Sequence, residues 1–205
     1  MTNTEQTILD AAEKLFLDKG YSGARTIEIA KEAGVNHAML HYYFRTKENL
    51  FNKIFEQKAE MLIGSLIHAF ETNLPFEERI QLGIERHFEF LRENPNLPLF
   101  ILRQIVTDEA RKKSFLKKIL PFGIKMSKRI STTLEEEIKQ KNIQPVSAID
   151  LLVNIASLNV FSFVAAQAFF DSDDENTRKE LDIFLENRKK NNVEIILNSF
   201  KNQSK

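Results

Sequence analysis

The sequence predicts an all-α protein. Only six glycines and five prolines interrupt the 205 residues, and no stretch keeps the apolar/polar alternation of a half-buried strand. Apolar residues instead recur at helical spacing, as Ile8, Ala12, Leu15 and Phe16 show. A hydrophobic content of 42% and a charged content of 28% are ordinary for a globular chain with a substantial core.

The first two expected helices are separated by glycine-containing turns. The first helix carries the stripe that begins at Ile8, and it stops in the segment "DKGYSG" at residues 18–23. A second, short helix starts at Thr26, whose hydroxyl can cap it, and Glu28 lies in its first turn, where the helix dipole favours an acid. Gly34 ends this helix.

The third helix and those after it follow from similar signals. Asn36 is a good N-cap, and Val35 and Leu40 have the spacing of a hydrophobic staple. Thr46 then caps a long helix that continues to about Phe70. The later prolines and the apolar periodicity predict further helices at 76–93, 98–109, 112–141, 147–170 and 178–201.

The helices at 26–34 and 37–44, joined by a short turn, form a helix-turn-helix unit. In the second of them Leu40 and Phe44 are one turn apart and face inward, while His37, Ala38, His41 and Tyr42 lie on the opposite side. An exposed face with imidazoles, a phenol and a small alanine suits a DNA groove, because these groups can bond phosphates or base edges.

The run "AEKLFLDKGYSGARTIEIAKEAGVNHAMLHYYFRTKENLF" resembles the DNA-binding domain of the TetR family of bacterial transcriptional regulators. The resemblance covers about the first fifty residues. The matching positions are Ala12, Leu15, Phe16, Gly20, Tyr21, Ile29, Ala30, Ala33, Gly34, Val35, Leu40, Phe44, Lys47, Glu48 and Leu50. It implies a three-helix DNA-binding domain at residues 1–46 and a larger helical domain for effector binding and dimerisation at residues 47–205.

The resemblance also implies which residues contact DNA. The start of the second helix would touch phosphate, the exposed face of the third would enter the major groove, and a lysine opening the fourth would contact phosphate. Two positions depart from the commonest family pattern, with Arg25 in place of a threonine or serine and His41 in place of a tyrosine. The implied residues are Arg25, Thr26, Asn36, His37, Ala38, Met39, His41, Tyr42 and Lys47.

For the larger domain the resemblance implies a ligand pocket and a regulator, most simply a repressor, that an effector releases from a palindromic operator. Fifteen of the seventeen phenylalanines lie at or beyond Phe51, so the pocket can be aromatic and suit a small apolar or amphipathic effector. The alternative is a helical small-molecule-binding protein without DNA binding. The candidate pocket residues, from helices that line the pocket in similar proteins, are Phe88, Arg103, Gln104, Phe122 and Asn154.

The segment 151–170, "LLVNIASLNVFSFVAAQAFF", is uncharged and long enough to span a bilayer. Polar residues such as Asn154 and Asn159 interrupt it, which favours the core of a helical assembly over a membrane span. We therefore expect a cytoplasmic protein without a membrane segment that forms a homodimer through its last two helices. The expected interface residues are Phe161, Val164, Phe184, Ile196 and Phe200.

Other functions find little support in the sequence. There is no cysteine, and the net charge of zero means that binding to an anionic partner must be local. His37 and His41 have the spacing of a zinc-protease pair, but Ala38 stands where that motif needs a glutamate, so we expect neither metal nor cofactor. No phosphate loop or nucleophile elbow indicates an enzyme. The basic run at 111–129 is either a solvated face or a rim for an anionic effector.

Overall fold

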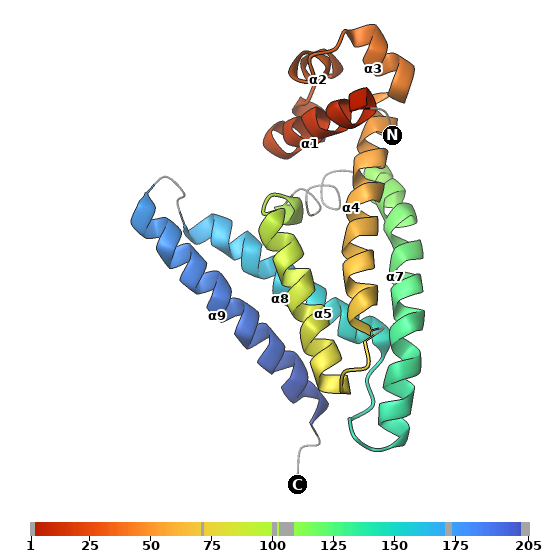
Figure 1. Ribbon diagram of the computed structural model, residues 1–205, viewed down its shortest axis with the longest axis vertical. Helices are drawn as coiled ribbons and strands as arrows, with labels where there is room; N and C mark the ends of the chain where they lie inside the picture. The colour runs from red at the N-terminus through yellow and green to blue at the C-terminus, as the bar shows by residue number, and fades with distance from the viewer. Residues whose placement is uncertain (1–2, 71, 100–101, 103–108, 171–173, 202–205) are drawn as a thin grey trace. The chain divides into compact units, whose positions relative to one another are not determined.

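The computed structural model describes residues 3–70, 72–99, 102, 109–170 and 174–201, with the backbone alone at 59, 62–68, 70, 110–111, 114–115, 118–119 and 122. These residues contain helices and no strand, as predicted. The chain divides into two compact units, residues 1–61 and 62–205, which are described separately (Figure 1). The functional boundary between 46 and 47 stays a prediction.

The first unit consists of α1 (Asn3–Gly23), α2 (Thr26–Glu32), α3 (His37–Phe44) and the first part of α4 (Lys47–Phe70). α2 packs against both α1 and α3, so the three helices form one cluster. Phe16 of α1 stacks on Tyr21 and meets Phe51 of α4 edge-on, which joins α4 to the cluster. The apolar stripe of the first helix and the predicted inward face of α3 are buried, namely Ile8, Ala12, Leu15, Phe16, Leu40 and Phe44. Ile29, Ala30 and Leu50 are buried with them.

Two glycines bend the backbone of the first unit where the sequence predicts helix ends. Gly20 has a φ of 70° and breaks the regular helix inside α1, within the predicted stop at 18–23. Gly34 has a φ of 66° directly after α2. A side chain is strained at such positive φ values, so glycine is the residue that allows both turns.

The helix caps are partly as predicted. The Asn36 side chain accepts a hydrogen bond from the Met39 backbone N–H at 2.8 Å, and the Thr46 hydroxyl accepts one from Asn49 at 3.1 Å. The predicted cap at Thr26 is wrong. Arg25 occupies the N-cap of α2 without a side-chain cap bond, and Thr26 is the first helical residue.

The second unit contains α5 (Phe76–Glu93), α7 (Glu109–Lys139), α8 (Ala148–Phe169) and α9 (Glu175–Phe200). The prediction of 76–93 is confirmed. α9 begins three residues before the predicted 178, because the Asp174 carboxylate caps it by accepting from Thr177. The helix predicted at 98–109 lies almost wholly outside the described residues.

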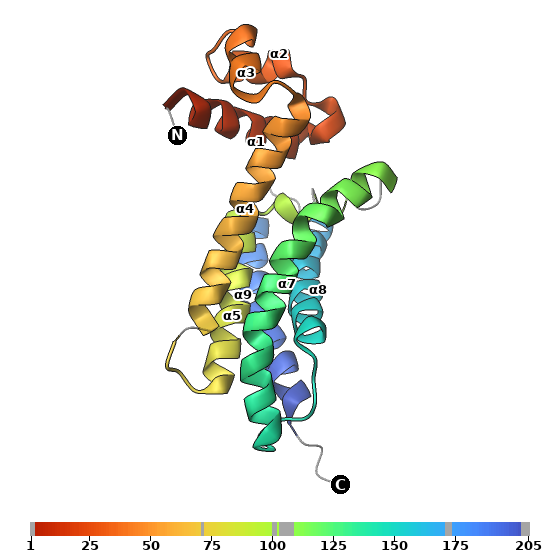
Figure 2. The same cartoon turned by 90° about the vertical axis from the view of Figure 1, so that its right-hand side faces the viewer.

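Helices α5, α7, α8 and α9 enclose the core of the second unit (Figure 2). Ile80 and Ile84 of α5, Ile130 of α7 and Leu151 of α8 are almost completely buried in it. Ile196 and Phe200 of α9 also lie in this core, against the same chain. The prediction that these last two contribute to a dimer interface is therefore wrong, because a side chain already buried has no surface to offer a partner. The core members are Phe76, Ile80, Ile84, Met126, Ile130, Leu134, Ile143, Ala148, Leu151, Ile155, Val193, Ile196 and Phe200.

Helix α8 is the one described helix whose length and composition would allow it to cross a membrane. It also packs against α5, α7 and α9, and its polar Asn159 and Ser162 are buried among them. A core helix of a globular protein has the same properties, so length and hydropathy alone do not indicate a membrane span.

Candidate functional site

Helix α3 carries two different faces. Leu40 is completely buried and Phe44 nearly so, which fixes the helix on the first unit. Ala38, His41 and Tyr42 are exposed, and Tyr42 keeps 81% of its surface. Packing within the unit does not require so large an exposed ring, so this face is available to a partner.

Thr26 and His37 contact each other across the helix-turn-helix. Oγ1 of Thr26 lies 3.0 Å from Nε2 of His37, in a half-buried position between the starts of α2 and α3. The His37 ring in turn meets the His41 ring edge-on, with centroids 4.6 Å apart. The resemblance implies that all three residues contact DNA, and the structure joins them in one row of polar groups.

Asn36 and Lys47 already have roles within the unit. The Asn36 side-chain oxygen caps α3, which leaves its amide nitrogen as the group that can donate outward. The Lys47 ammonium lies 4.5 Å from the centre of the Tyr21 ring, a cation–π contact that holds the start of α4 against the end of α1.

Arg45 is a candidate that the sequence analysis does not name. It lies exposed between α3 and α4 with φ 57° and ψ −47°, and the Thr46 N–H donates to the Phe44 carbonyl at 2.6 Å across it. This is a γ-turn of a kind that is strained in any residue with a side chain. A basic residue between a helix end and the cap Thr46 is the only sequence signal that points to it.

Ion pairs connect α2 to α1 on one side. Lys14 contacts Glu32 at 2.6 Å, and Lys19 contacts Glu28 at 3.0 Å. Hydrogen bonds from these lysines hold the pKa values of Glu28 and Glu32 below their ordinary range. The Arg25 backbone N–H contributes to the lowered pKa of Glu28 as well.

The second unit contains a buried polar network that joins α5, α8 and α9. The Asn159 amide nitrogen donates to the Ile84 carbonyl at 3.0 Å and to Nδ1 of His87 at 3.1 Å. Its oxygen accepts from Asn192 at 2.9 Å. Arg188 donates to the Asn192 oxygen at 2.7 Å. Burial lowers the pKa of His87 to about 4, so this imidazole is neutral at physiological pH.

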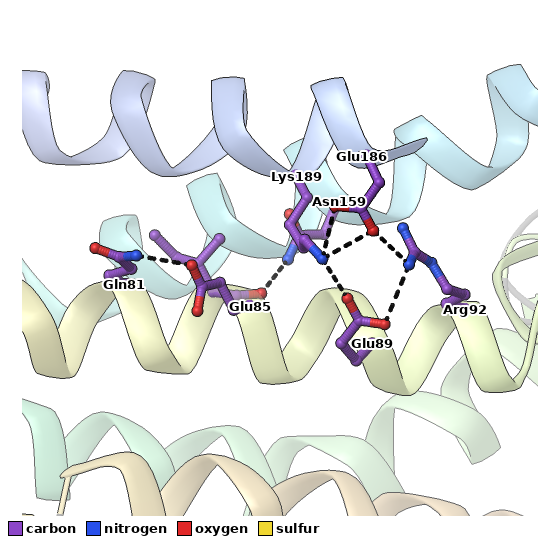
Figure 3. Close-up of polar contacts among 8 residues, drawn as sticks. Gln81, Glu85, Glu89, Arg92, Asn159, Glu186 and Lys189 are labelled. Carbon is purple, nitrogen blue, oxygen red and sulfur yellow. Dashed lines mark hydrogen bonds and ion pairs between the residues drawn. The ribbon is translucent and has the colours of Figure 1, made fainter. Parts of the chain in front are cut away.

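A group of four alternating charges lies beside this network (Figure 3). Lys189 of α9 contacts Glu89 of α5 at 2.6 Å, and Arg92 of α5 contacts Glu186 of α9 at 2.6 Å. Hydrogen bonds from Arg92 and Lys189 lower the pKa of Glu186. Each cation therefore has an acid on the facing helix, which holds α9 against α5.

A half-open groove of about 820 Å³ adjoins Arg92 at the ends of α5 and α8 and the first part of α9. Apolar side chains predominate in it, as is usual for sites that bind small organic molecules. The lining residues are Arg92, Pro95, Asn96, Phe163, Ala166, Gln167, Ala168, Phe169, Phe170, Leu181, Asp182 and Leu185.

Neither of the two predicted pocket residues whose side chains are described, Phe88 and Asn154, lines this groove. Phe88 is completely buried and packs on Phe163, so it supports the groove from behind. Asn154 is exposed elsewhere on α8. Arg103 and Gln104 lie outside the described residues, as does the side chain of Phe122. A ligand role for these five residues stays a prediction.

Within the described part of the chain, no group of three His, Asp or Glu side chains is placed to hold a metal ion. The His37 and His41 rings lie edge to face, as stated above, and the neighbouring Thr26 hydroxyl takes up one nitrogen of His37.

Comparison with known proteins places these features in a family. Residues 8–54 match the profile described as bacterial regulatory proteins, tetR family. The fatty acid metabolism regulator protein of Bacillus subtilis is 29% identical over 92 residues, which cover 45% of this chain and 47% of that protein. The chain thus spans about half the length of this curated relative, and 40% of the transcriptional activator FasR of Mycolicibacterium smegmatis.

Solved structures extend the likeness to both units. FadR of B. subtilis, a transcriptional regulator in complex with stearoyl-CoA, aligns over 96% of this chain and 99% of its own, with a TM-score of 0.72 and 19% identity. The haemolysin II transcriptional regulator HlyIIR aligns over 98% of both chains, with a TM-score of 0.63 and 26% identity. The first likeness concerns the fold alone. The helix-turn-helix with its exposed α3 face lies within the matched residues 8–54, so this segment of the chain belongs to the tetR family of bacterial regulatory proteins.

Proposed function

We propose that the protein is a cytoplasmic, ligand-responsive transcriptional repressor that binds a palindromic DNA operator as a homodimer. The observation that carries the proposal is the exposed face of α3, with Ala38, His41 and Tyr42 outward on a helix held by buried Leu40 and Phe44. A helix held in this way by its neighbours is the element that a helix-turn-helix protein inserts into the major groove.

In this proposal the polar groups around α3 fix the position of the first unit (residues 1–61, which we call the head) on the DNA backbone. Thr26 donates its hydroxyl hydrogen to a phosphate while it accepts from Nε2–H of His37. Arg25, Arg45 and Lys47 supply positive charge at the helix starts and ends. Because the net charge of the chain is zero, we expect each dimer to neutralise on the order of five DNA phosphates or fewer. The affinity for DNA should therefore depend only moderately on salt concentration.

Exposed apolar residues on the last two helices support the dimer. Ile149, Val153 and Phe161 of α8 keep 58–67% of their surface, and Ile183 and Ile195 of α9 keep 62% and 48%. Such side chains can form the core of an interface. Sedimentation of wild type and Phe161→Glu tests this. We expect a dimer that the variant weakens, and a stable wild-type monomer at micromolar concentration would contradict it.

The groove at the ends of α5 and α8 is the proposed effector site. Its apolar lining suits an acyl chain, and the Arg92 side chain, which is part of the lining, suits a polar head group. Because FadR is described in complex with stearoyl-CoA, long-chain acyl-CoA is the first class of effector to test. Stearoyl-CoA should lower operator affinity, and Ala168→Trp, which fills the groove, should abolish this response while operator binding persists.

Selection of bound sequences from random duplex DNA tests the central claim. The full-length protein should enrich a palindrome with half-sites about one helical turn, roughly 34 Å, apart. His41→Ala should reduce affinity for that palindrome by about tenfold per half-site, the loss of one hydrogen bond to a charged group in each. The control Met61→Ala, an exposed residue at the end of the first unit, should bind like wild type. If the selection recovers no preferred sequence, the proposed role as a DNA-binding regulator is wrong. The alternative, a small-molecule-binding protein without DNA binding, would then be favoured.

A further inference from the structure

The polar side chains available for reading bases on α3 are few. The Asn36 oxygen is occupied as a helix cap, and Nε2 of His37 is occupied by Thr26. No arginine, lysine or glutamine, the side chains that commonly read guanine or adenine, lies in α3 itself. Only His41 and Tyr42 remain exposed on α3 for polar contacts with bases, so apolar contacts can add to the sequence discrimination.

The exposed surface of the helix-turn-helix is rich in apolar groups. Four large apolar side chains are exposed among the described residues of the first unit, and three of them, Ile27, Met39 and Tyr42, belong to α2 and α3. Ile27 keeps 67% of its surface, although its neighbours Ile29 and Ala30 on the same helix are completely or almost completely buried. Packing of the head gives no reason for an isoleucine at this position.

The contacts of Thr26 locate Ile27. Thr26 touches His37, so the first turn of α2, which contains Ile27, lies beside the first turn of α3. The outward acids of α2, Glu28 and Glu32, are paired with lysines of α1 on another side. Lys31, one turn after Ile27, shares its face and is exposed. The face that carries Ile27 thus has a cation and no carboxylate, which suits a surface close to phosphates.

We propose that Ile27 is a specificity-determining residue that contacts the C5-methyl group of a thymine in the major groove, beside the bases covered by α3. The proposal rests on the proposed DNA-binding function. Among the four base pairs only A·T and T·A present a methyl group in the major groove, and an aliphatic side chain is the chemistry that recognises it. The operator should therefore hold, in each half-site, a thymine whose methyl group is required although its hydrogen-bonding edge is not.

Uracil in place of thymine tests this directly, because it removes the methyl group and keeps base pairing. Each thymine of the selected palindrome is replaced in turn, symmetrically in both half-sites, and the affinity of the full-length dimer is measured. At one position we expect the affinity to fall about fourfold per half-site, which is the effect of one buried methyl group. Replacement in both half-sites should lower the affinity about fifteenfold. In Ile27→Ala the same replacement should change the affinity less than twofold. The response of Ile27→Val to uracil should lie between those of wild type and Ile27→Ala.

Met61→Ala, in which an equally exposed apolar residue of the same unit is truncated, is the matched control and should show the full wild-type response to uracil. If the protein selects a palindrome but no uracil replacement weakens it, the proposed contact is overturned. It is also overturned if Ile27→Ala retains the wild-type response to uracil at every position. If no palindrome is selected at all, the DNA-binding function itself fails, which is a distinguishable result.

Discussion

Replacement of His87 by glutamine should make the second unit less sensitive to acid. The imidazole is buried between α5 and α8, where Nδ1 accepts a hydrogen bond from the Asn159 amide. Burial lowers its pKa to about 4, from an ordinary value of 6.5. Protonation would also set a new N–H against the amide hydrogens of Asn159, since that amide is held in orientation by Ile84 and Asn192.

The sign of the effect follows from which state binds the proton. Between pH 6.5 and 4 the unfolded chain protonates His87 and the folded chain does not, so stability falls as pH falls through this window. The full difference of 2.5 pH units corresponds to about 3 kcal/mol, of which about 2 kcal/mol is lost between pH 7.5 and pH 5. Above about pH 7.5, where the unfolded chain no longer binds this proton, the residue contributes almost no pH dependence.

Urea unfolding at about pH 7.5 and pH 5, followed by far-ultraviolet circular dichroism, measures this difference. A glutamine oxygen can accept from Asn159 but does not titrate. Between pH 7.5 and pH 5 the free energy of unfolding of His87→Gln should therefore fall by about 2 kcal/mol less than that of wild type. All three tyrosines, at residues 21, 42 and 43, lie in the first unit, so their fluorescence serves as an internal control and should not respond to the variant. Parallel pH profiles of wild type and variant would refute the reasoning.

Three further predictions concern local features. Arg45→Gly should relieve the strain of the γ-turn, stabilise the first unit by about 1 kcal/mol in thermal unfolding and weaken DNA binding. A loss of stability would show that the turn is not strained. Asn36→Ala should cost about 1 kcal/mol through the lost cap, and Asn36→Asp should restore most of it; equal stability of both variants would exclude the cap as the cause. A double-mutant cycle with Glu89→Gln and Lys189→Met should give a coupling free energy of about 1 kcal/mol in urea unfolding. If the two changes in the free energy of unfolding are strictly additive, the ion pair between Glu89 and Lys189 at 2.6 Å does not contribute to stability.

The head was largely predictable from the sequence because its signals are local. Gly34, Asn36 and Thr46 act on residues within one turn of themselves, and the Leu40/Phe44 stripe shows which side of α3 faces inward. The error at Thr26 has a tertiary cause. Its hydroxyl bonds a histidine eleven residues away, and this contact competes with a local cap.

The second unit was predictable in its helices but not in its polar interior. Asn159 reads in the sequence as an interruption of an apolar helix, and nothing near it in the chain identifies His87 or Asn192 as its partners. These residues come from three helices, and only packing brings them together. Ile27 was missed for the opposite reason, since helical periodicity does not tell whether an apolar residue beside a buried stripe is itself buried.

The buried network constrains how this protein can change over evolutionary time. Asn159, Asn192 and His87 each satisfy a group on another helix, so loss of any one leaves a buried amide or imidazole without its partner at a cost of about 1–3 kcal/mol. Replacement of all of them together with Arg188, which donates to Asn192, by apolar residues can be nearly neutral. Lineages can therefore reach a fully apolar interior only through destabilised ancestors. The outer surfaces of the same helices can vary one residue at a time, so new effectors and partners are acquired around an interior that stays as it is.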